Sequence, residues 1–258
     1  DITWETTTST DLGLDVNFLN NRLQFHFDYY WKETKDMLLN IEIPYFMGYN
    51  NPSTNAGKMS THGYDIEVAW NDQIGDFKYG VNVNFSDFLS KIDYMNDGEQ
   101  ISGGKIKRAG VLFNEFYGYV CEGIYQTQEE VNNSARTSTT VTVGDLKYRD
   151  ISGPDGVPDG VISPEYDRVP LGNSLPRFQY GGSLNASYKG IDFSLAFQGI
   201  GKQNSYLSTS MVQPLRDNYG NVPAILEGKY WSPFNTTEEN LAAKYLSLIH
   251  ISEPTRHS

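Results

Sequence analysis

The chain has 258 residues, a formal net charge of −12 at pH 7 and a hydrophobic content of 38%. No apolar run reaches the roughly 18 residues of a membrane-spanning helix, and the negative charge argues against nucleic-acid binding, which needs a basic surface. The single Cys121 excludes an internal disulfide, and no Cys/His spacing of the zinc type is present.

The first predicted element is a β-hairpin over residues 12–31. Apolar side chains occupy every second position of two runs, 12–18 and 23–31, and Asn20-Asn21 between them is a plausible turn. Successive side chains on a strand point to opposite faces, so each run has one apolar and one polar face. We therefore expect two amphipathic strands here.

Two further hairpins repeat this pattern. One spans residues 64–85 and turns near Gly75, and the other spans residues 178–199 and turns at Lys189-Gly190. A short turn with glycine between two alternating runs is typical of a β-hairpin. The arms of the last hairpin have about 11 and about 9 residues, close to the length that a tilted strand needs to cross a bilayer.

Six amphipathic strands predict an all-β, antiparallel fold, and two architectures explain their faces. A transmembrane β-barrel has lipid outside and water inside, whereas a soluble β-sandwich has its core on one side and solvent on the other. Strand length and the aromatic residues of the strands favour the barrel. These aromatic residues are Tyr29, Trp31, Trp70, Phe77 and Tyr188.

Long connections alternate with the short turns. Four are expected, over residues 40–60, 96–107, 126–175 and 205 onward. Short turns on one side and long loops on the other are typical of outer-membrane barrels. Within the connections, residues 113–125 predict an irregular strand. Residues 128–133 predict a helical turn, because Glu129 and Glu130 suit a helix N-terminus.

The two ends of the chain read as interruptions of a longer protein. The first residues carry no signal sequence, so we expect the true N-terminus elsewhere. Residues 246–256 read LSLIHISEPTR, which resembles the translation of a sequencing-library adapter. We therefore expect residues 1–245 to be one partial barrel domain and residues 246–258 to be an artefact tail.

Several blocks of the sequence resemble the SusC/RagA-like TonB-dependent outer-membrane transporters. The first block reads DLGLDVNFLNNRLQFHFDYYWKETKDMLL, and the last predicted hairpin matches the family's "YKGFDLSxxFQG" segment. The blocks occur in the family's order and cover nearly all of residues 4–245. They are residues 11–39, 55–67, 116–130, 144–173 and 178–199.

This resemblance implies the C-terminal part of an outer-membrane barrel of about 22 strands with long extracellular loops. It implies import of oligosaccharides or peptides, without catalysis, at the cell outer membrane. The implied partners are outer-membrane lipid, a SusD-like surface lipoprotein, and a TonB complex acting through an N-terminal region that this sequence lacks. From the residues alone, a secreted carbohydrate-binding β-sandwich or a glycosidase module stays open. No phosphate loop, G-x-S-x-G elbow or HExxH motif supports an enzyme.

The stretch at residues 150–167, DISGPDGVPDGVISPEYD, is a candidate calcium loop. Oxygen-bearing residues and glycines at short intervals can wrap a calcium ion. Pro154 and Pro158 interrupt the family's D-x-N-G-D-G pattern, and Asp and Gly also serve ordinary turns, so both interpretations stay open. No other cofactor is expected. The candidate ligands are the side chains of Asp150, Asp155, Asp159 and Asp167 and the carbonyl of Val161.

Two further sets of residues are candidates for contact with cargo. Aromatic rings of the long loops can stack on sugar rings or peptide side chains, and packing against a partner explains them equally well. They are Tyr45, Phe46, Tyr49, Tyr230 and Trp231. Polar residues of the strands are expected to line the barrel interior, which is the default for such a face. They are Asp15, Asn17, His26, Asp28, Asp65, Glu67, Asn82, Asn84, Gln179 and Asn185.

Overall fold

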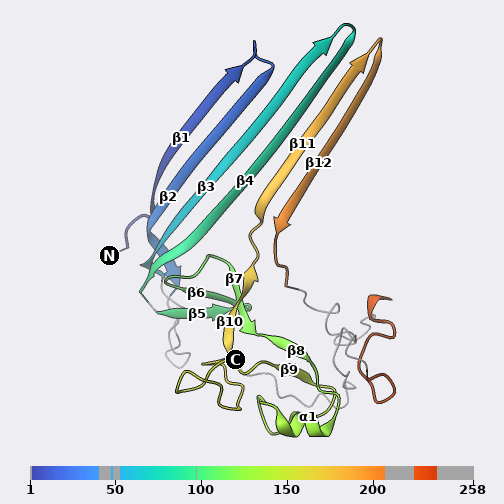
Figure 1. The fold of residues 1–258 in the computed structure, drawn as a ribbon. Helices are drawn as coiled ribbons and strands as arrows, with labels where there is room; N and C mark the ends of the chain where they lie inside the picture. Colours follow the sequence, from blue (N-terminus) through green and yellow to red (C-terminus); the bar gives the residue numbers. More distant parts are fainter. Residues whose placement is uncertain (1, 41–47, 49–52, 97, 207–223, 237–258) are drawn as a thin grey trace. The chain divides into compact units, whose positions relative to one another are not determined.

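A computed structural model describes residues 2–40, 48, 53–96, 98–206 and 224–236 of the chain (Figure 1). The chain divides into two compact units. The first consists of Asp1–Phe116 and Gly172–Asn204, and the second of Tyr117–Leu171 and Ser205–Ser258. The first contains a large β-sheet, and the second contains short strands, a helix and loops.

Six antiparallel strands form the large sheet, in the order β1-β2-β3-β4-β11-β12 (Figure 1). The three predicted hairpins are confirmed, because β1 pairs with β2, β3 with β4, and β11 with β12. β11 also pairs with β4, although the long connection between them interrupts the sequence. The strands are β1 Thr6–Phe18, β2 Leu23–Asn40, β3 Ser53–Ile74, β4 Phe77–Met95, β11 Arg177–Tyr188 and β12 Ile191–Lys202.

The turns that close the hairpins have the backbone that their residues favour. Lys189 and Gly190 have φ angles of 46° and 87°. Two central residues with positive φ form the turn type whose twist matches that of the flanking strands. Asn20 and Asn21 also have positive φ, at 57° and 65°, and asparagine tolerates this conformation better than most residues.

β2, β3 and β4 extend well beyond the apolar alternation that predicted them. Residues 53–60 are strand and not loop, so the expected connection over residues 40–60 was wrong in this part. The β2–β3 ladder continues to Asn40 opposite Ser53, with irregularities near Met37. In these extensions apolar and polar residues no longer alternate regularly, although Ala56, Ile92 and Met95 are buried there. The period of two therefore disappears from the sequence while the backbone ladder persists.

An ion pair fixes β11 to β4 where their pairing begins. The carboxylate of Asp87, which is 5% exposed, accepts hydrogen bonds from Nε and Nη2 of Arg177, both at 2.5 Å. It also accepts a bond from the backbone N–H of Phe178 at 3.2 Å. A bidentate pair of this kind holds two groups in one geometry, so it positions β11 on the sheet.

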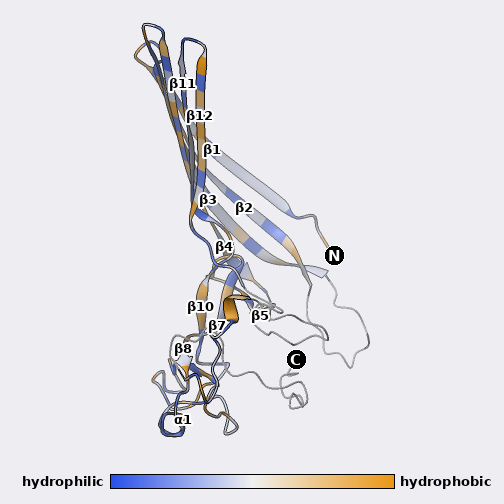
Figure 2. Ribbon diagram, turned by 90° about the vertical axis from the view of Figure 1, so that its right-hand side faces the viewer, coloured by the Kyte–Doolittle hydropathy of each residue, from blue (hydrophilic) through white to orange (hydrophobic). Residues whose placement is uncertain are grey.

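The sheet has one apolar and one polar face. In the register, Phe25 lies opposite Val68 and Val68 opposite Val83, all on one face. His26 lies opposite Glu67 on the other face. Figure 2 shows the resulting alternation of hydrophobic and hydrophilic residues along β12.

The apolar face is not covered as a sandwich would require. Phe25 and Phe27 are half-buried, and Val83, Leu195 and Phe197 are 44%, 48% and 47% exposed. In a sandwich the same residues would be buried between two sheets. The soluble-sandwich hypothesis is therefore wrong.

Smaller elements occupy the connection between β4 and β11. One sheet has the order β10-β7-β6-β5, and β8 pairs with β9. The expected loop over residues 96–107 contains β5 and β6, and the predicted irregular strand over residues 113–125 divides into β7 and β8. The strands are β5 Glu99–Ser102, β6 Lys105–Arg108, β7 Glu115–Tyr119, β8 Cys121–Ile124, β9 Leu146–Tyr148 and β10 Arg168–Asn173.

The second unit has a small core of its own around α1, Gln128–Asn133, at the predicted helical turn. The hydroxyl of Thr127 caps the helix by accepting a bond from the N–H of Glu130, and Val131 is 0% exposed. A short 3-10 helix, η3, spans Ala224–Leu226. Among the described residues, no helix is long and apolar enough to cross a membrane. The other large buried side chains of this unit are Ile124, Tyr125, Ile162, Leu226 and Trp231.

Candidate functional site

The apolar face of the large sheet forms a band of defined height. We call it the apolar band; on β3 it extends from Tyr64 to Ile74, and Asp72, paired with Arg22 at 3.3 Å, interrupts it near the short turns. At about 3.3 Å per residue this is about 33 Å of strand. At a tilt of about 40°, such a strand covers about 25 Å along the membrane normal, which is the height of the apolar band on outer-membrane barrels.

Aromatic rings lie at both ends of the apolar band. At the end with the short turns, Phe77 stacks on Tyr79 with ring centroids 5.6 Å apart and meets Tyr188 edge-on at 6.5 Å. At the other end, Tyr29 and Trp31 form an edge-on pair at 5.2 Å. Girdles of aromatic residues mark the two lipid–water interfaces of membrane barrels.

The polar face has a charged part on β1, β2 and β3. Asp15 lies opposite His26, and Nδ1 of His26 lies 2.6 Å from Oδ1 of Asp15. Asp28 lies directly opposite Asp65, so two like charges meet across the strands. Directly opposed like charges are unfavourable, which indicates that stability alone does not explain this arrangement.

The remainder of the polar face, on β4, β11 and β12, is formed mainly by amides and hydroxyls. Asn82, Asn84, Gln179 and Gln198 line an open groove of about 690 Å³. Amides both donate and accept hydrogen bonds, so this surface suits an uncharged polar solute. The predicted interior residues all lie on this polar face, but the sequence did not show that the charges concentrate on β1, β2 and β3. Lys78 and Asp192, near the short turns, are charged residues on the other strands.

The candidate calcium loop is organised around Asp167, which is 0% exposed. Its Oδ1 accepts bonds from the N–H groups of Ile151 at 2.7 Å and Ser152 at 3.2 Å, and its Oδ2 accepts one from Ser163 at 2.7 Å. Burial alone would raise the pKa of Asp167, but these backbone bonds outweigh it and lower the pKa. The carboxylate is thus used to hold the loop together.

The other candidate calcium ligands do not gather around an ion. Asp150 accepts from the N–H of Gly160 at 2.7 Å, and Asp159 accepts from that of Val161 at 2.9 Å. Asp155 is exposed. Within the described residues, no three acidic, His or Cys side chains form a group that could hold a metal. In this conformation the loop does not fit calcium, and the calcium site stays a prediction.

The candidate aromatic residues fall into different places. Tyr45, Phe46 and Tyr49 lie outside the described residues. Trp231 is 8% exposed: its Nε1–H donates to Oε1 of Gln126 at 3.1 Å, and its ring covers Gly144. A ring in this position packs and offers little surface to a ligand. Tyr230 is 40% exposed, and its role in ligand binding stays a prediction.

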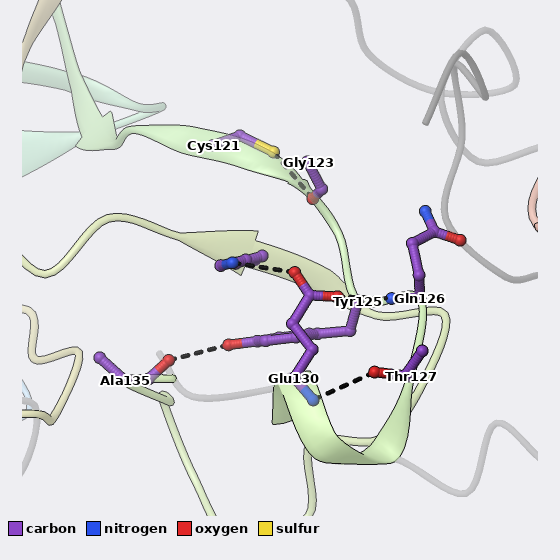
Figure 3. Close-up of polar contacts among 8 residues, drawn as sticks. Cys121, Gly123, Tyr125, Gln126, Thr127, Glu130 and Ala135 are labelled. Carbon is purple, nitrogen blue, oxygen red and sulfur yellow. Dashed lines mark hydrogen bonds and ion pairs between the residues drawn. The ribbon is translucent and has the colours of Figure 1, made fainter. Parts of the chain in front are cut away.

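A polar network around α1 was not predicted beyond the helix itself (Figure 3). Glu130 accepts a bond from the N–H of Gln126 at 2.9 Å and pairs with Nζ of Lys147 at 2.9 Å. The Gln126 N–H and then Lys147 lower the pKa of Glu130, and Glu130 raises the pKa of Lys147. The Tyr125 hydroxyl donates to the carbonyl of Ala135 at 2.8 Å. The Thr127 and Glu130 spacing signals the cap in the sequence, but nothing in the sequence signals the pairing with Lys147.

Comparison with known proteins decides between the remaining interpretations. A family model described as "TonB dependent receptor-like, beta-barrel" matches residues 1–248. The chain belongs to this family. It is 30% identical over 249 residues to TonB-dependent receptors P26 and P3 of Formosa agariphila, which covers 92% of this chain and 24% of each relative. It is 28% identical over 134 residues to TonB-dependent receptor SusC of Bacteroides thetaiotaomicron, which covers 45% of this chain and 13% of SusC.

Solved structures show the same fold. The chain matches the RagAB peptide transporter with a TM-score of 0.70 at 23% identity, over 94% of this chain and 26% of that one. It matches the RagAB peptide importer in its open-open state with a TM-score of 0.70 at 21% identity, over 96% and 26%. This chain therefore spans about a quarter of the length of the receptors and transporters that it matches.

Membership in the TonB-dependent receptor family confirms the antiparallel barrel fold and the SusC/RagA resemblance. The family is one of receptors and transporters of the outer membrane, and it is not a family of enzymes. The glycosidase alternative is therefore wrong. The six-stranded sheet is accordingly a section of a barrel wall, with lipid against its apolar band and the barrel interior on its polar face.

Proposed function

We propose that this chain is part of an outer-membrane transporter that imports oligosaccharides. The observation that carries the proposal is the sheet itself, which has an exposed apolar band of membrane height on one face and hydrophilic residues on the other. This arrangement suits a wall between lipid and a water-filled passage. Such a wall holds cargo and guides it without changing it chemically.

The amide-lined groove on β4, β11 and β12 supports an uncharged polar cargo. Asn84 and Gln179 can each donate and accept hydrogen bonds, as the hydroxyls of a sugar require. Peptide backbones present similar groups, so a peptide is the alternative cargo that the experiment below separates.

The proposed partners follow from the family. We propose a SusD-like surface lipoprotein at the loops and a TonB complex that acts through an N-terminal region outside this sequence. The relative named SusC and the RagAB assemblies support such a pairing.

Uptake by the complete transporter tests this proposal. Cells that express it, with and without a functional TonB complex, are given labelled oligosaccharides or labelled peptides. We expect TonB-dependent uptake of oligosaccharides. TonB-dependent uptake of peptides alone would overturn the cargo, and uptake of neither, by protein that is correctly inserted in the outer membrane, would overturn the transporter proposal.

Within the groove, Asn84→Ala should slow oligosaccharide uptake. Thr6→Ala is the control, because Thr6 is exposed on the opposite face of the same sheet. Equal uptake by the two variants would show that the groove does not contact cargo.

A further inference from the structure

A groove of about 510 Å³ lies on the lipid-facing side of β1, β2 and β3, directly above the apolar band. We call it the collar groove. Its register is clear, because Thr10 pairs with Trp31 and Trp31 with His62, while Leu12 pairs with Tyr29 one row below. The lining residues on the lipid-facing side include Thr8, Thr10, Tyr29, Trp31, Glu33 and His62.

The floor of the collar groove is aromatic. Trp31 is 51% exposed, and its ring stands edge-on to that of Tyr29. An exposed indole face is a good platform for the apolar face of a sugar ring, and tryptophan prefers the boundary between lipid and water.

The walls of the collar groove offer polar groups that the protein itself does not use. Within the described residues, the hydroxyls of Thr8 and Thr10 and the ring nitrogens of His62 make no hydrogen bond with the rest of the chain. A sugar needs such a combination of an apolar platform with donors and acceptors at its edges.

The two lysines above the groove, Lys35 and Lys58, are paired with Glu33. Lys32, which also lines the groove, has its Nζ 5.3 Å from the ring centroid of Tyr30, on the opposite face of the sheet. Glu33 accepts from Nζ of Lys35 at 2.8 Å and from Nζ of Lys58 at 2.5 Å. Both ammonium groups are held by this one carboxylate, so the cluster keeps a single net positive charge and each lysine is already engaged within the protein. The chemistry of the groove therefore favours a neutral saccharide.

Below the groove, an exposed aliphatic path leads down the same face. Leu12 and Leu14 on β1 are 65% and 52% exposed, and Val68 on β3 is 38% exposed. Side chains of this kind are in contact with acyl chains in a membrane barrel. A molecule that fills both parts must have a sugar head and an acyl tail.

We infer that the collar groove binds the sugar headgroup of an outer-leaflet glycolipid whose acyl chains follow the aliphatic path below it. This inference rests on the proposed function only in placing the sheet in an outer membrane. The site lies on the face opposite to the cargo groove, so bound lipid and cargo do not compete.

Native mass spectrometry of the complete transporter tests this inference, with dephosphorylated lipid A, an uncharged acylated glucosamine disaccharide, as the probe. Trp31→Ala should lower the fraction of protein that retains the dephosphorylated lipid A by about five- to tenfold, as expected from the loss of one aromatic stacking contact. Tyr188→Ala is the matched control, because Tyr188 is 48% exposed at the other end of the apolar band. His62→Phe keeps a ring without its nitrogens and should lower retention by about threefold, since it removes one hydrogen bond.

Three results would overturn the inference. The first is equal retention by Trp31→Ala and Tyr188→Ala. The second is equal, Trp31-dependent retention of phosphatidylglycerol, which indicates a phosphate site. The third is equal binding of the deacylated disaccharide, which indicates a cargo site. In each of these cases, TonB-dependent uptake by the unchanged transporter would still support the proposed function. Conversely, loss of uptake with normal retention of dephosphorylated lipid A would count against the proposed function and not against this inference.

Discussion

The two units of the chain place their large hydrophobic side chains in opposite positions. In the sheet, Leu195 and Phe197 are 48% and 47% exposed, whereas in the second unit Tyr125 and Val131 are 1% and 0% exposed. The second unit is built for water and buries its apolar residues. The sheet is built for lipid, which satisfies its apolar band from outside. The same chain therefore removes apolar side chains from water in two ways, by burial within the protein in the second unit and by contact with lipid in the sheet.

Acidic residues differ in the same way. Asp28 is exposed on the polar face of the sheet, whereas Asp167 is buried in the second unit and holds three backbone N–H groups. Asp28 is thus available to the barrel interior, whereas Asp167 replaces regular secondary structure as a partner of the backbone. The sheet also has a buried carboxylate, Asp87, which is paired with Arg177.

Removal of a core ring should have the largest effect, and only in the second unit. Trp231→Ala removes a buried ring and its bond to Gln126, which should cost about 4 kcal/mol. We expect faster hydrogen exchange at Tyr125 and Val131 and unchanged exchange in the sheet. Phe234→Ala, at a fully exposed ring (100%), is the control. Unchanged exchange in Trp231→Ala would show that this core does not depend on the ring.

A charge in the apolar band should affect the sheet and leave the second unit intact. Val83 lies near the middle of the band, where an arginine costs about 3 kcal/mol in a membrane barrel. Val83→Arg should therefore lower the denaturant midpoint of the complete transporter refolded in lipid. Asn84→Arg places the same charge on the polar face. If both variants were equally unstable, the assignment of the two faces would be wrong.

Asp167→Asn tests the backbone-holding role of the buried carboxylate. The substitution replaces one carboxylate oxygen by an amide NH2 group, which cannot accept a hydrogen bond from a backbone N–H. We expect the loss of this bond to lower the stability of the loop by about 2 kcal/mol. The expected result is faster proteolysis within residues 150–167. Asp155→Asn, at an exposed position of the same loop, should behave as the unchanged protein. Equal protection of both variants would assign the loop's stability to other contacts.

The smallest expected effect is a pH dependence in the second unit. Because the pKa of Glu130 in the folded protein is below its ordinary value of 4.5, its contribution is present above that value and is lost as the pH falls through the folded pKa. Its side chain is 30% exposed, so we expect a loss of no more than about 1 kcal/mol between pH 7 and pH 3.5.

The measurement for Glu130 is the exchange of α1 amides at the two pH values. Glu130→Gln should show a flatter pH dependence than the unchanged protein, with the contribution of Asp167 cancelling in the difference. An identical pH dependence in both proteins would contradict a role for the Glu130 pair with Lys147.

The sequence predicted the centre of the sheet well and its margins poorly. The alternation from Phe77 to Phe85 exists because lipid and water contact opposite faces there. Beyond Phe85 the strand continues to Met95, where the following connection bonds to it and Ile92 and Met95 are buried, so lipid and water no longer contact opposite faces and impose no period of two. The ladder of hydrogen bonds that extends it depends on partner strands and leaves no mark in local composition.

The sequence predicts which residues lie on the polar face of the sheet, but it does not predict which of them are neighbours across strands. The alternation within each strand assigns His26 and Asn84 to the face that lines the barrel interior. Only the register between strands shows which charged residues and amides lie next to one another. The packing of Trp231 could not be predicted from the sequence. Its partner Gln126 is far away in the sequence, and no local feature distinguishes a packed ring from one that binds ligand.

The difference between the two ends of the hairpins has an evolutionary consequence. The turn consists of Lys189 and Gly190 alone, because Tyr188 already pairs with Ile191. An insertion there would therefore disturb the register of two strands. The connection from Asn96 to Leu175 can gain or lose whole elements while β4 and β11 stay paired. New specificities can therefore arise by insertion and deletion at one end, while the part that enters the membrane is inherited unchanged. Libraries for engineering this protein belong in that connection.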